Sequence, residues 1–310
     1  MSRSDPRSPF GKTRRRIIVG SAAGAVALLG SLTAGARVHV AVDPTRPLLA
    51  GRAPALFIGH GSPMNALRDT EFTRMLRAWG ARIGTPKGIV MVSAHWLTDG
   101  VTAVSIVERP PTIHDFAGFP RELNEFEYPA PGLPGYAREA AFRIRQGRVV
   151  QSRDWGLDHG AWSVLRHLYP DAGVPVFQVS IDYGKPGAHH AAVGRDLAAF
   201  RDLGVLVIGS GNLVHNLALT DRNAADSRQA TMPWAQAYDA AARRALDGRD
   251  VKALTRYASL DPSARVAVPT PDHYYPLLYA LGASADDERA QYVYEGFQSG
   301  SISMRCVQFG

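Results

Sequence analysis

Four of the ten histidines in this 310-residue chain follow an apolar run or stand at a break, where a side chain can point into a cleft. They are His60, His95, His215 and His273. Neutral imidazole is the commonest metal ligand in proteins, and strand ends hold ligands more precisely than mobile loops. A single histidine of this kind is usually a hydrogen-bonded structural residue, so the recurrence of the context is what predicts one mononuclear metal site.

The glycine-bearing loops around these histidines allow two other interpretations. The segment 209–212 (GSGN) could bind a phosphate, but it lacks the third glycine of the G-x-G-x-x-G fingerprint and occurs late in the chain. The segment 59–62 (GHGS) could offer a serine nucleophile, but it does not match G-x-S-x-G. The glycines on both sides of His60 instead let the backbone turn sharply and approach a ligand closely.

Apolar runs of strand length alternate with segments of helical periodicity, which predicts one α/β domain with a mostly parallel or mixed central sheet flanked by helices. Strands are expected at 55–58, 88–93, 101–107, 174–180 and 205–209, and helices at 69–81, 135–146, 161–168, 188–203 and 234–246. Segments 291–297 and 302–308 flank Ser299 and Gly300, which predicts a C-terminal antiparallel hairpin. Ligand sites in such sheets lie beyond the carboxyl ends of the strands.

The first 36 residues read as an export signal rather than as part of the fold. Arg14, Arg15 and Arg16 precede a stretch, 17–36, that has no charged residue and ends in Ala-Gly-Ala. This pattern is typical of a twin-arginine-like signal peptide, with export to the periplasm. An uncleaved membrane anchor is the alternative, because about 20 apolar residues can span a bilayer. Residues 37–52 are then a lead-in segment, and 53–310 are expected to form the folded domain.

Charge and cysteine content narrow the classes of function. The formal net charge is +7, but the first 36 residues contribute +5 of it, so no basic surface for nucleic acid is indicated. The chain has one cysteine, Cys306, which excludes an intrachain disulfide and a cysteine-rich zinc site. Any metal must therefore be held by His, Asp or Glu.

Five blocks around the histidines together resemble the DOPA-dioxygenase type of class III extradiol ring-cleavage dioxygenases, within the LigB-like superfamily. They are residues 57–65 (FIGHGSPMN), 92–96 (VSAHW), 114–120 (HDFAGFP), 156–162 (GLDHGAW) and 209–216 (GSGNLVHN). Each block alone is weak, but the resemblance runs in order from about residue 54 to the C-terminus. It implies a catecholic substrate that is cleaved beside its diol with O2, giving a semialdehyde.

The resemblance also implies a role for each histidine. His60 and His95 match the first two metal ligands of the family, and His273 matches the place of the third. His215 matches the histidine that acts as acid and base beside the metal, and it is a possible additional ligand. His159 matches a catalytic histidine that faces the substrate and O2.

The third ligand is where this chain departs from the usual non-haem Fe(II) site of two histidines and one carboxylate. His273 stands at that place, and the adjacent Asp272 is expected to point elsewhere if His273 points inward. A site made only of histidines suits Zn(II) as well as Fe(II), and members of this subgroup are often assigned zinc. One divalent metal, Zn(II) or Fe(II), is therefore expected.

The block around His114 and Asp115 is expected to form a pocket wall or lid that binds substrate, with Trp96 lining or supporting it. Asp115 or Asp158 could orient a ligand imidazole, although a helix or turn cap is an equally good interpretation of Asp115. His189 and His190 are predicted to be surface residues of an amphipathic helix.

Three functions remain open at this point. The first is an extradiol dioxygenase acting on a catechol. The second is a zinc-dependent hydrolase or lyase on the same scaffold, and the third is a non-catalytic, exported metal-binding module. Expected partners are a small catechol and O2, without nucleic acid and without stable membrane insertion once the signal is cleaved. The sequence does not identify the catechol.

Overall fold

The computed structural model describes residues 47–221 and 231–310. The expected signal peptide, 1–36, and most of the lead-in segment lie outside the described residues. Within the described ranges, the chain has no helix that is both long and apolar enough to cross a membrane.

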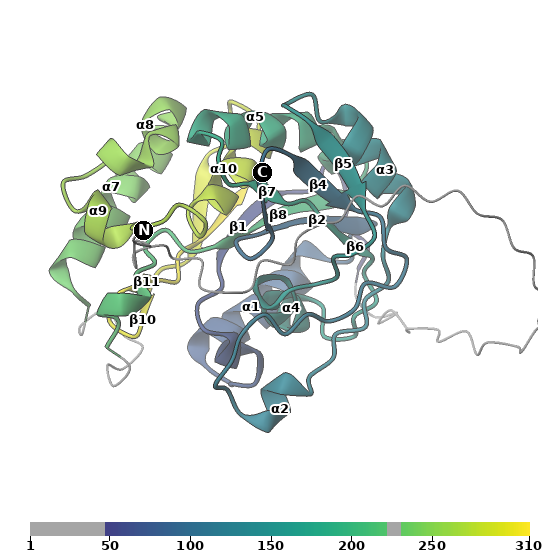
Figure 1. Cartoon of the computed structure of the whole chain (residues 1–310), viewed down its shortest axis with the longest axis horizontal. Helices are drawn as coiled ribbons and strands as arrows, with labels where there is room; N and C mark the ends of the chain where they lie inside the picture. The colour runs from purple at the N-terminus through teal and green to yellow at the C-terminus, as the bar shows by residue number, and fades with distance from the viewer. Residues whose placement is uncertain (1–46, 222–230) are drawn as a thin grey trace, which may run out of the picture. The chain divides into compact units, whose positions relative to one another are not determined.

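A six-stranded mixed sheet forms the centre of the domain, in the order β6-β2-β8-β1-β12-β9 (Figure 1). Four strands run parallel to one another: β6 (Val176–Gln178), β2 (Gly88–Ser93), β8 (Val205–Gly211) and β1 (Ala55–Gly59). Two antiparallel strands extend the sheet beyond β1: β12 (Cys306–Phe309) next to it and β9 (Ala290–Tyr294) at the edge. The predicted α/β fold with a mixed central sheet is therefore confirmed.

Helices cover both faces of this sheet (Figure 1). On one face lie α1 (Glu71–Ile83) and α4 (His159–Leu168), and on the other lie α5 (Gly187–Leu197), α7 (Pro233–Asp247) and α10 (Tyr275–Ala283). The strands alternate between the two cores: in β2, Ile89 and Met91 pack with the first group, and Val90 and Val92 with the second. Burying one such side chain stabilises the fold by about 1.5–3 kcal/mol, so both layers hold the sheet in place.

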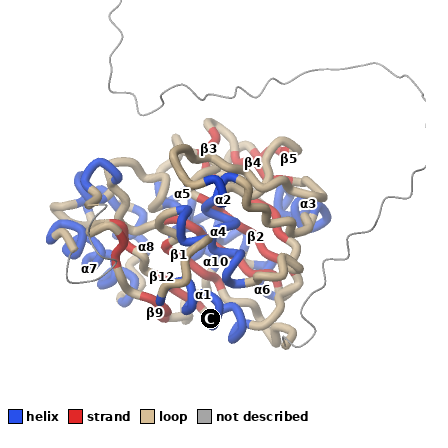
Figure 2. The backbone as a smooth tube through the Cα atoms, turned by 90° about the horizontal axis from the view of Figure 1, so that it is seen from below, coloured by secondary structure: helices blue, strands red, loops and turns tan. Residues whose placement is uncertain are grey.

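Shorter elements surround these layers. The remaining helices are α2 (Arg121–Asn124), α3 (Pro134–Arg143), α6 (Ala199–Asp202), α8 (Val251–Thr255) and α9 (Ala264–Ala267), with single 3-10 turns η1 (Pro63–Ala66), η2 (Leu217–Leu219) and η3 (Tyr257–Ser259). Three small strand pairs are β3 (Leu97–Thr98) with β7 (Ile181–Asp182), β4 (Thr102–Ser105) with β5 (Val149–Ser152), and β10 (Phe297–Gln298) with β11 (Ile302–Ser303). The perpendicular view shows β4 and β5 beside α3 (Figure 2).

The C-terminal hairpin forms as predicted, with β10 and β11 next to its tip and β9 and β12 continuing it into the main sheet. Two other expectations need correction. The strand expected at 101–107 becomes β4, which pairs with the unpredicted β5 instead of joining the main sheet. The helix expected at 188–203 is divided at Ala198 into α5 and α6.

His190 is fully buried, so the prediction of a surface residue was wrong for it. Helix α5 lies so close to α10 that a Cβ on Gly194 would come within 2.3 Å of the Tyr279 carbonyl oxygen. This approach places the His190 ring against Tyr275, with 3.9 Å between ring centroids. The amphipathic pattern of α5 could not reveal a partner helix that lies some 85 residues later in the chain.

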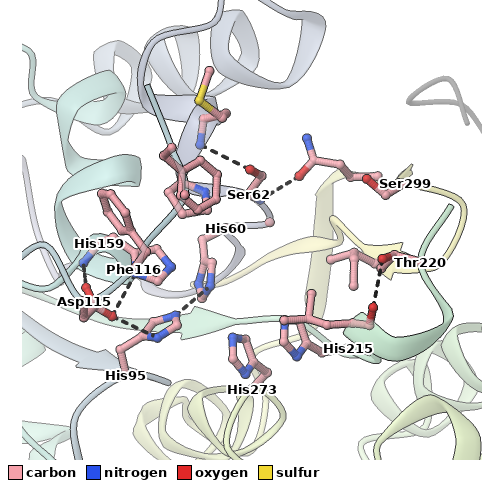
Figure 3. A pocket seen from close by; sticks show the side chains of 18 of the residues that line it. His60, Ser62, His95, Asp115, Phe116, His159, His215, Thr220, His273 and Ser299 are labelled. Carbon is pink, nitrogen blue, oxygen red and sulfur yellow. Dashed lines mark hydrogen bonds and ion pairs between the residues drawn. The ribbon is translucent and has the colours of Figure 1, made fainter. Parts of the chain in front are cut away.

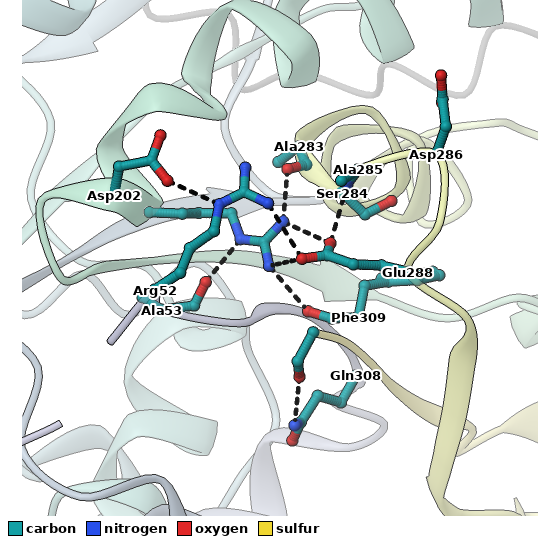
Figure 4. A network of polar contacts seen from close by, with 12 residues as sticks. Arg52, Ala53, Asp202, Ala283, Ser284, Ala285, Asp286, Glu288, Gln308 and Phe309 are labelled. Carbon is teal, nitrogen blue, oxygen red and sulfur yellow. Dashed lines mark hydrogen bonds and ion pairs between the residues drawn. The ribbon is translucent and has the colours of Figure 1, made fainter. Parts of the chain in front are cut away.

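A network of polar contacts gathers around Glu288 near the amino ends of β1 and β8 (Figure 4). The guanidinium of Arg201, whose exposed fraction is 0%, makes a two-pronged ion pair with Glu288, with both N–O distances at 2.7 Å. It also donates to three carbonyl oxygens: those of Ala53, Ala283 and Phe309. All five of its N–H groups therefore have an acceptor.

Candidate metal centre

The carboxyl ends of β1, β8 and β2 come together in register, which brings the first two expected ligands to one edge. Ser210 in β8 pairs with Ile58 in β1 on one side and with Ser93 in β2 on the other. His60 directly follows β1, and His95 comes two residues after β2. Side chains that leave adjacent parallel strands at this point meet beyond the sheet, as expected for a ligand site in an α/β fold.

The third expected ligand, His273, arrives from the turn that begins α10. Its carbonyl oxygen accepts a hydrogen bond from the Asn212 amide at 2.8 Å. A Cβ on Gly211 would lie only 2.1 Å from that same oxygen, so this approach requires glycine. The glycine-bearing carboxyl end of β8 thus positions His273, and the phosphate-binding interpretation of this segment is not needed.

His60, His95 and His273 each offer a ring nitrogen within 4.8 Å of the others (Figure 3). The Nε2 atoms of His60 and His95 are 3.2 Å apart. Neutral nitrogen donors this close can share one divalent ion, with typical Zn–N distances of about 2.0–2.1 Å.

The tautomer of His60 is fixed by a serine beneath it. Its Nδ1 lies 3.0 Å from the Ser210 hydroxyl, and that hydroxyl donates its only proton to the Gly160 carbonyl oxygen at 2.6 Å. The Ser210 oxygen must therefore accept from His60, which places the proton on Nδ1. The Nε2 atom keeps its lone pair and can bind a metal.

Carboxylates fix the other two rings in the same way. His95 Nδ1 lies 3.2 Å from Asp115 Oδ2, and His273 Nδ1 lies 2.5 Å from Asp272 Oδ2. The Asp272 carboxylate accepts a hydrogen bond from the His273 Nδ1–H, and Asp115 lies within ion-pair distance of His95 Nδ1, so the Nε2 atom of each ring is left for a metal. Such partners hold a ligand imidazole in orientation and raise its basicity. The donor set therefore fits a divalent metal.

The expectation that Asp272 points away from the site was wrong. The amides of Tyr274 and Tyr275 both donate to the Pro271 carbonyl oxygen, so the chain turns tightly at the start of α10. Within that turn the Asp272 carboxylate folds back onto the neighbouring His273 ring. The carboxylate is still present in the site, but it contacts the third imidazole instead of replacing it.

Burial favours the neutral form of two of the imidazoles, His60 and His95. Burial lowers the pKa of His60 and of His95 well below the usual value, and the nearby histidines lower it further. Burial raises the pKa of Asp272, but the adjacent His273 outweighs it and the pKa falls below its usual range. Neutral rings supported by ionised carboxylates are the protonation states that metal binding needs.

His215 and His159 lie on either side of the three rings and line the cavity. The ring of His215 stacks on that of His273, with 3.5 Å between centroids and 6° between planes. His159 is the first residue of α4, and its Nδ1 lies 2.8 Å from Asp115 Oδ2 while its amide donates to Asp115 Oδ1. Asp115 therefore joins His95 to His159, whereas Asp158 caps α4 and contacts no imidazole in the hydrogen bonds of the described residues.

A cavity of about 780 Å³ opens above the imidazoles, but two of the three residues expected to contact substrate lie outside its lining. Trp96 is buried and stacks on Trp155, with ring planes 3° apart, so it supports the fold behind His95. His114 contacts the Phe126 carbonyl oxygen at 2.9 Å and packs on Trp162. Asp115 does line the cavity.

Several lining residues were not predicted from the sequence. The C-terminal hairpin contributes Gln298, Ser299 and Ile302, and the segment after His60 contributes Met64 and Arg68. The HGSPMN block gave a signal for Met64, which it contains, but it ends before Arg68. No local signal marked the hairpin tip, which reaches the cavity only through tertiary packing.

Known proteins resemble this chain over nearly all of the described residues. A family model described as the catalytic LigB subunit of aromatic ring-opening dioxygenase matches residues 54–309. A "4,5-DOPA dioxygenase extradiol" of Escherichia coli (strain K12) is 43% identical over 263 residues, covering 84% of this chain and 95% of that protein. One of the same name from Beta vulgaris is 36% identical, covering 82% and 95%.

A solved structure also resembles this chain in sequence and fold. The crystal structure of an uncharacterized protein from Escherichia coli K12 has a TM-score of 0.72 and 40% sequence identity, covering 84% of this chain and all of that chain. The matches confirm the resemblance inferred from the histidine blocks and the prediction of an extradiol dioxygenase enzyme. This chain belongs to the family of the catalytic LigB subunit of aromatic ring-opening dioxygenases.

Proposed function

We propose that this enzyme uses Fe(II), held by His60, His95 and His273, to open the ring of a catechol beside its diol. The observation that carries the proposal is the common state of the three rings, each with Nδ1 on an oxygen acceptor and Nε2 left for a metal. Bound Fe(II) would hold the diol and pass electrons to O2. The relatives named 4,5-DOPA dioxygenase favour a DOPA-like catechol.

His215 is the residue we assign to accept the first catechol proton. Burial lowers its pKa well below the usual value, so its ring is neutral and able to take a proton. Among the described residues, no side chain forms a hydrogen bond with either of its ring nitrogens, so the ring is not committed to a protein partner. Its stacking on His273 keeps the ring beside the ligands.

His159 is assigned to hold or deliver a proton from the opposite side. Its Nδ1–H is held by Asp115, so Nε2 is the atom that exchanges a proton with the bound reactants. The same Asp115 oxygen lies beside His95 Nδ1, which couples the position of His159 to that of a metal ligand. Phe116 packs edge-on against His159 and limits the access of water to it.

The test is anaerobic reconstitution with Fe(II), followed by a panel of catechols in air. We expect oxygen uptake and a yellow ring-fission product, both lost in His215→Ala without loss of bound metal. His189→Ala is the matched control, because it removes an imidazole that lies outside the cavity lining. Stoichiometric zinc that iron cannot displace, without oxygen uptake on any catechol, would contradict the proposal.

We also propose that the protein is exported to the periplasm in a folded state by the twin-arginine route. The support is the run Arg14, Arg15 and Arg16 before the uncharged segment 17–36. Replacing Arg14 and Arg15 with Lys should leave the protein in the cytoplasm, as fractionation would reveal. A periplasmic location of that variant would refute the proposal, and an uncleaved product in the membrane fraction would favour the anchor.

A further inference from the structure

One arginine lines the cavity that holds the imidazoles. Arg68 is the only Lys or Arg among the described residues of that lining. The volume of about 780 Å³ is ample for a drug-sized ligand, so a catechol that carries a side chain can fit. Ser62 and Ser299, which also line the cavity, lie on the side away from His95 and Asp115 (Figure 3).

The guanidinium of Arg68 has no partner among the described residues. The neighbouring carboxylate, Asp69, is already paired through one oxygen with Arg74 at 2.9 Å and through the other with Arg77. The cavity's own carboxylate, Asp115, is held by His95 and His159. No acidic side chain therefore neutralises Arg68 within the described part of the chain.

The segment that carries Arg68 is fixed relative to the metal site. Arg68 comes eight residues after His60, and the 3-10 turn η1 lies between them. The Asn65 side chain within that turn donates to the His60 carbonyl oxygen at 2.9 Å. The turn is closed by the Leu67 amide, which donates to the Met64 carbonyl oxygen. One short rigid segment thus presents both a metal ligand and an unpaired cation to the same cavity.

We propose that Arg68 binds an anionic group, a carboxylate, on the side chain of the catechol. This inference rests on the proposed function and specifies its substrate class: catechols with an anionic side chain over neutral and cationic ones. A guanidinium suits the role because its planar fork matches a carboxylate with two parallel hydrogen bonds. Arg68 is then a specificity-determining residue, since no proton transfer is assigned to it.

The position of Arg68 determines which kinetic constant it affects. An interaction made equally in the ground state and the transition state changes KM and leaves kcat unchanged. Because Arg68 is exposed at the cavity, solvent screens its charge, and we expect an effect of about ten-fold at low salt. The preference should weaken as ionic strength rises.

The experiment compares three probes that differ in side-chain charge: 3-(3,4-dihydroxyphenyl)propionate, 4-methylcatechol and dopamine. The variants are Arg68→Gln, Arg68→Lys and Arg68→Glu, with Arg82→Gln as the control that removes an exposed charge from α1 outside the cavity. KM and kcat are measured with the Fe(II)-loaded enzyme. Affinities for the same probes are measured by calorimetry without oxygen, so that binding is tested even if turnover is absent.

We expect Arg68→Gln to raise KM and the dissociation constant for the propionate about ten-fold, and those for 4-methylcatechol less than two-fold. Arg68→Lys should retain part of the preference, and Arg68→Glu should make dopamine the better ligand. Equal effects on all three probes, or equal effects of Arg82→Gln, would overturn the role of Arg68. Absence of turnover with charge-selective binding would instead contradict the proposed function alone.

Discussion

Strand β1 has a buried polar cluster at each of its ends, and the two clusters differ in what they leave unbonded. At the amino end, Arg201 gives all five N–H groups to acceptors, including both oxygens of Glu288. At the carboxyl end, the Nδ1 atoms of His60, His95 and His273 each lie beside an oxygen atom of a serine or carboxylate side chain. Their Nε2 atoms meet one another at a cavity instead of finding protein acceptors.

This difference distinguishes a buried polar cluster that stabilises the fold from one that can bind a ligand. Buried polar groups in native proteins are almost always hydrogen-bonded, so a group of unsatisfied nitrogens calls for a ligand. The Arg201 cluster is complete without any ligand and can serve only the fold. The histidine cluster is complete only when a metal accepts the lone pairs of its Nε2 atoms. Substitutions at the carboxyl end of β1 should therefore affect metal binding, and those at the amino end should affect stability.

The largest expected effect is the loss of a ligand. His273→Ala should abolish stoichiometric metal binding and reduce activity below detection, because two imidazoles do not hold the metal at its site. The measurement is metal content by elemental analysis after dialysis, together with oxygen uptake. Full metal content in His273→Ala would show that the ligand set is assigned wrongly.

At the opposite end of β1, Arg201→Met should reduce the free energy of unfolding by about 3–5 kcal/mol, because the buried carbonyl oxygens of Ala53, Ala283 and Phe309 lose their donor and Glu288 loses its buried arginine partner. Denaturant titration of the apoprotein measures this effect. Arg52→Met is the control: Arg52 also contacts Glu288, but it is 35% exposed, so its loss should cost about 1 kcal/mol or less. The double variant Arg201→Met with Glu288→Leu should recover much of the loss. If Arg201→Met lowered the metal affinity as well as the free energy of unfolding, the two clusters would not be independent.

Smaller effects should follow from substituting a residue that forms a hydrogen bond with a ligand imidazole. Ser210→Ala removes the acceptor that holds the proton of His60 on Nδ1, and it should weaken metal affinity about 10–100-fold. Competition with a chelator measures this. Ser163→Ala is the matched control, since Ser163 is also buried but its hydroxyl has no hydrogen-bond partner in the described structure. Equal losses in both variants would mean that Ser210 acts through packing.

The sequence predicted the fold class and the positions of the histidines because both depend on local patterns. Strand-length apolar runs mark where each strand ends, and a histidine such as His60 or His95 follows directly. The partners of the Nδ1 atoms were harder to predict, since Ser210 lies 150 residues from His60 and reaches it only through strand pairing. Asp272 was misplaced because a tight turn reverses the direction that simple alternation along the chain suggests.

His190 tests the same distinction with the smallest expected effect. It is a buried histidine, but its hydrogen bonding resembles that of Arg201 more than that of the metal ligands. Its Nδ1 lies 3.0 Å from the Tyr279 hydroxyl and its Nε2 lies 3.2 Å from the Lys185 carbonyl oxygen, so both nitrogens are satisfied. Burial, with the charge of His189, lowers its pKa to about 3. We therefore expect no metal at this residue, and an effect on stability alone.

The sign of the pH dependence follows from the protons bound in each state. Between pH 6.5 and about 3 the unfolded chain holds a proton on His190 that the folded chain does not, so stability falls as pH falls. Near pH 5 this contribution amounts to about 1–2 kcal/mol relative to pH 7. Urea titrations of apoprotein at both pH values should show a smaller loss in His190→Gln than in wild type. The same loss in both proteins would mean that the other buried histidines, whose pKa values are also lowered, account for the acid sensitivity.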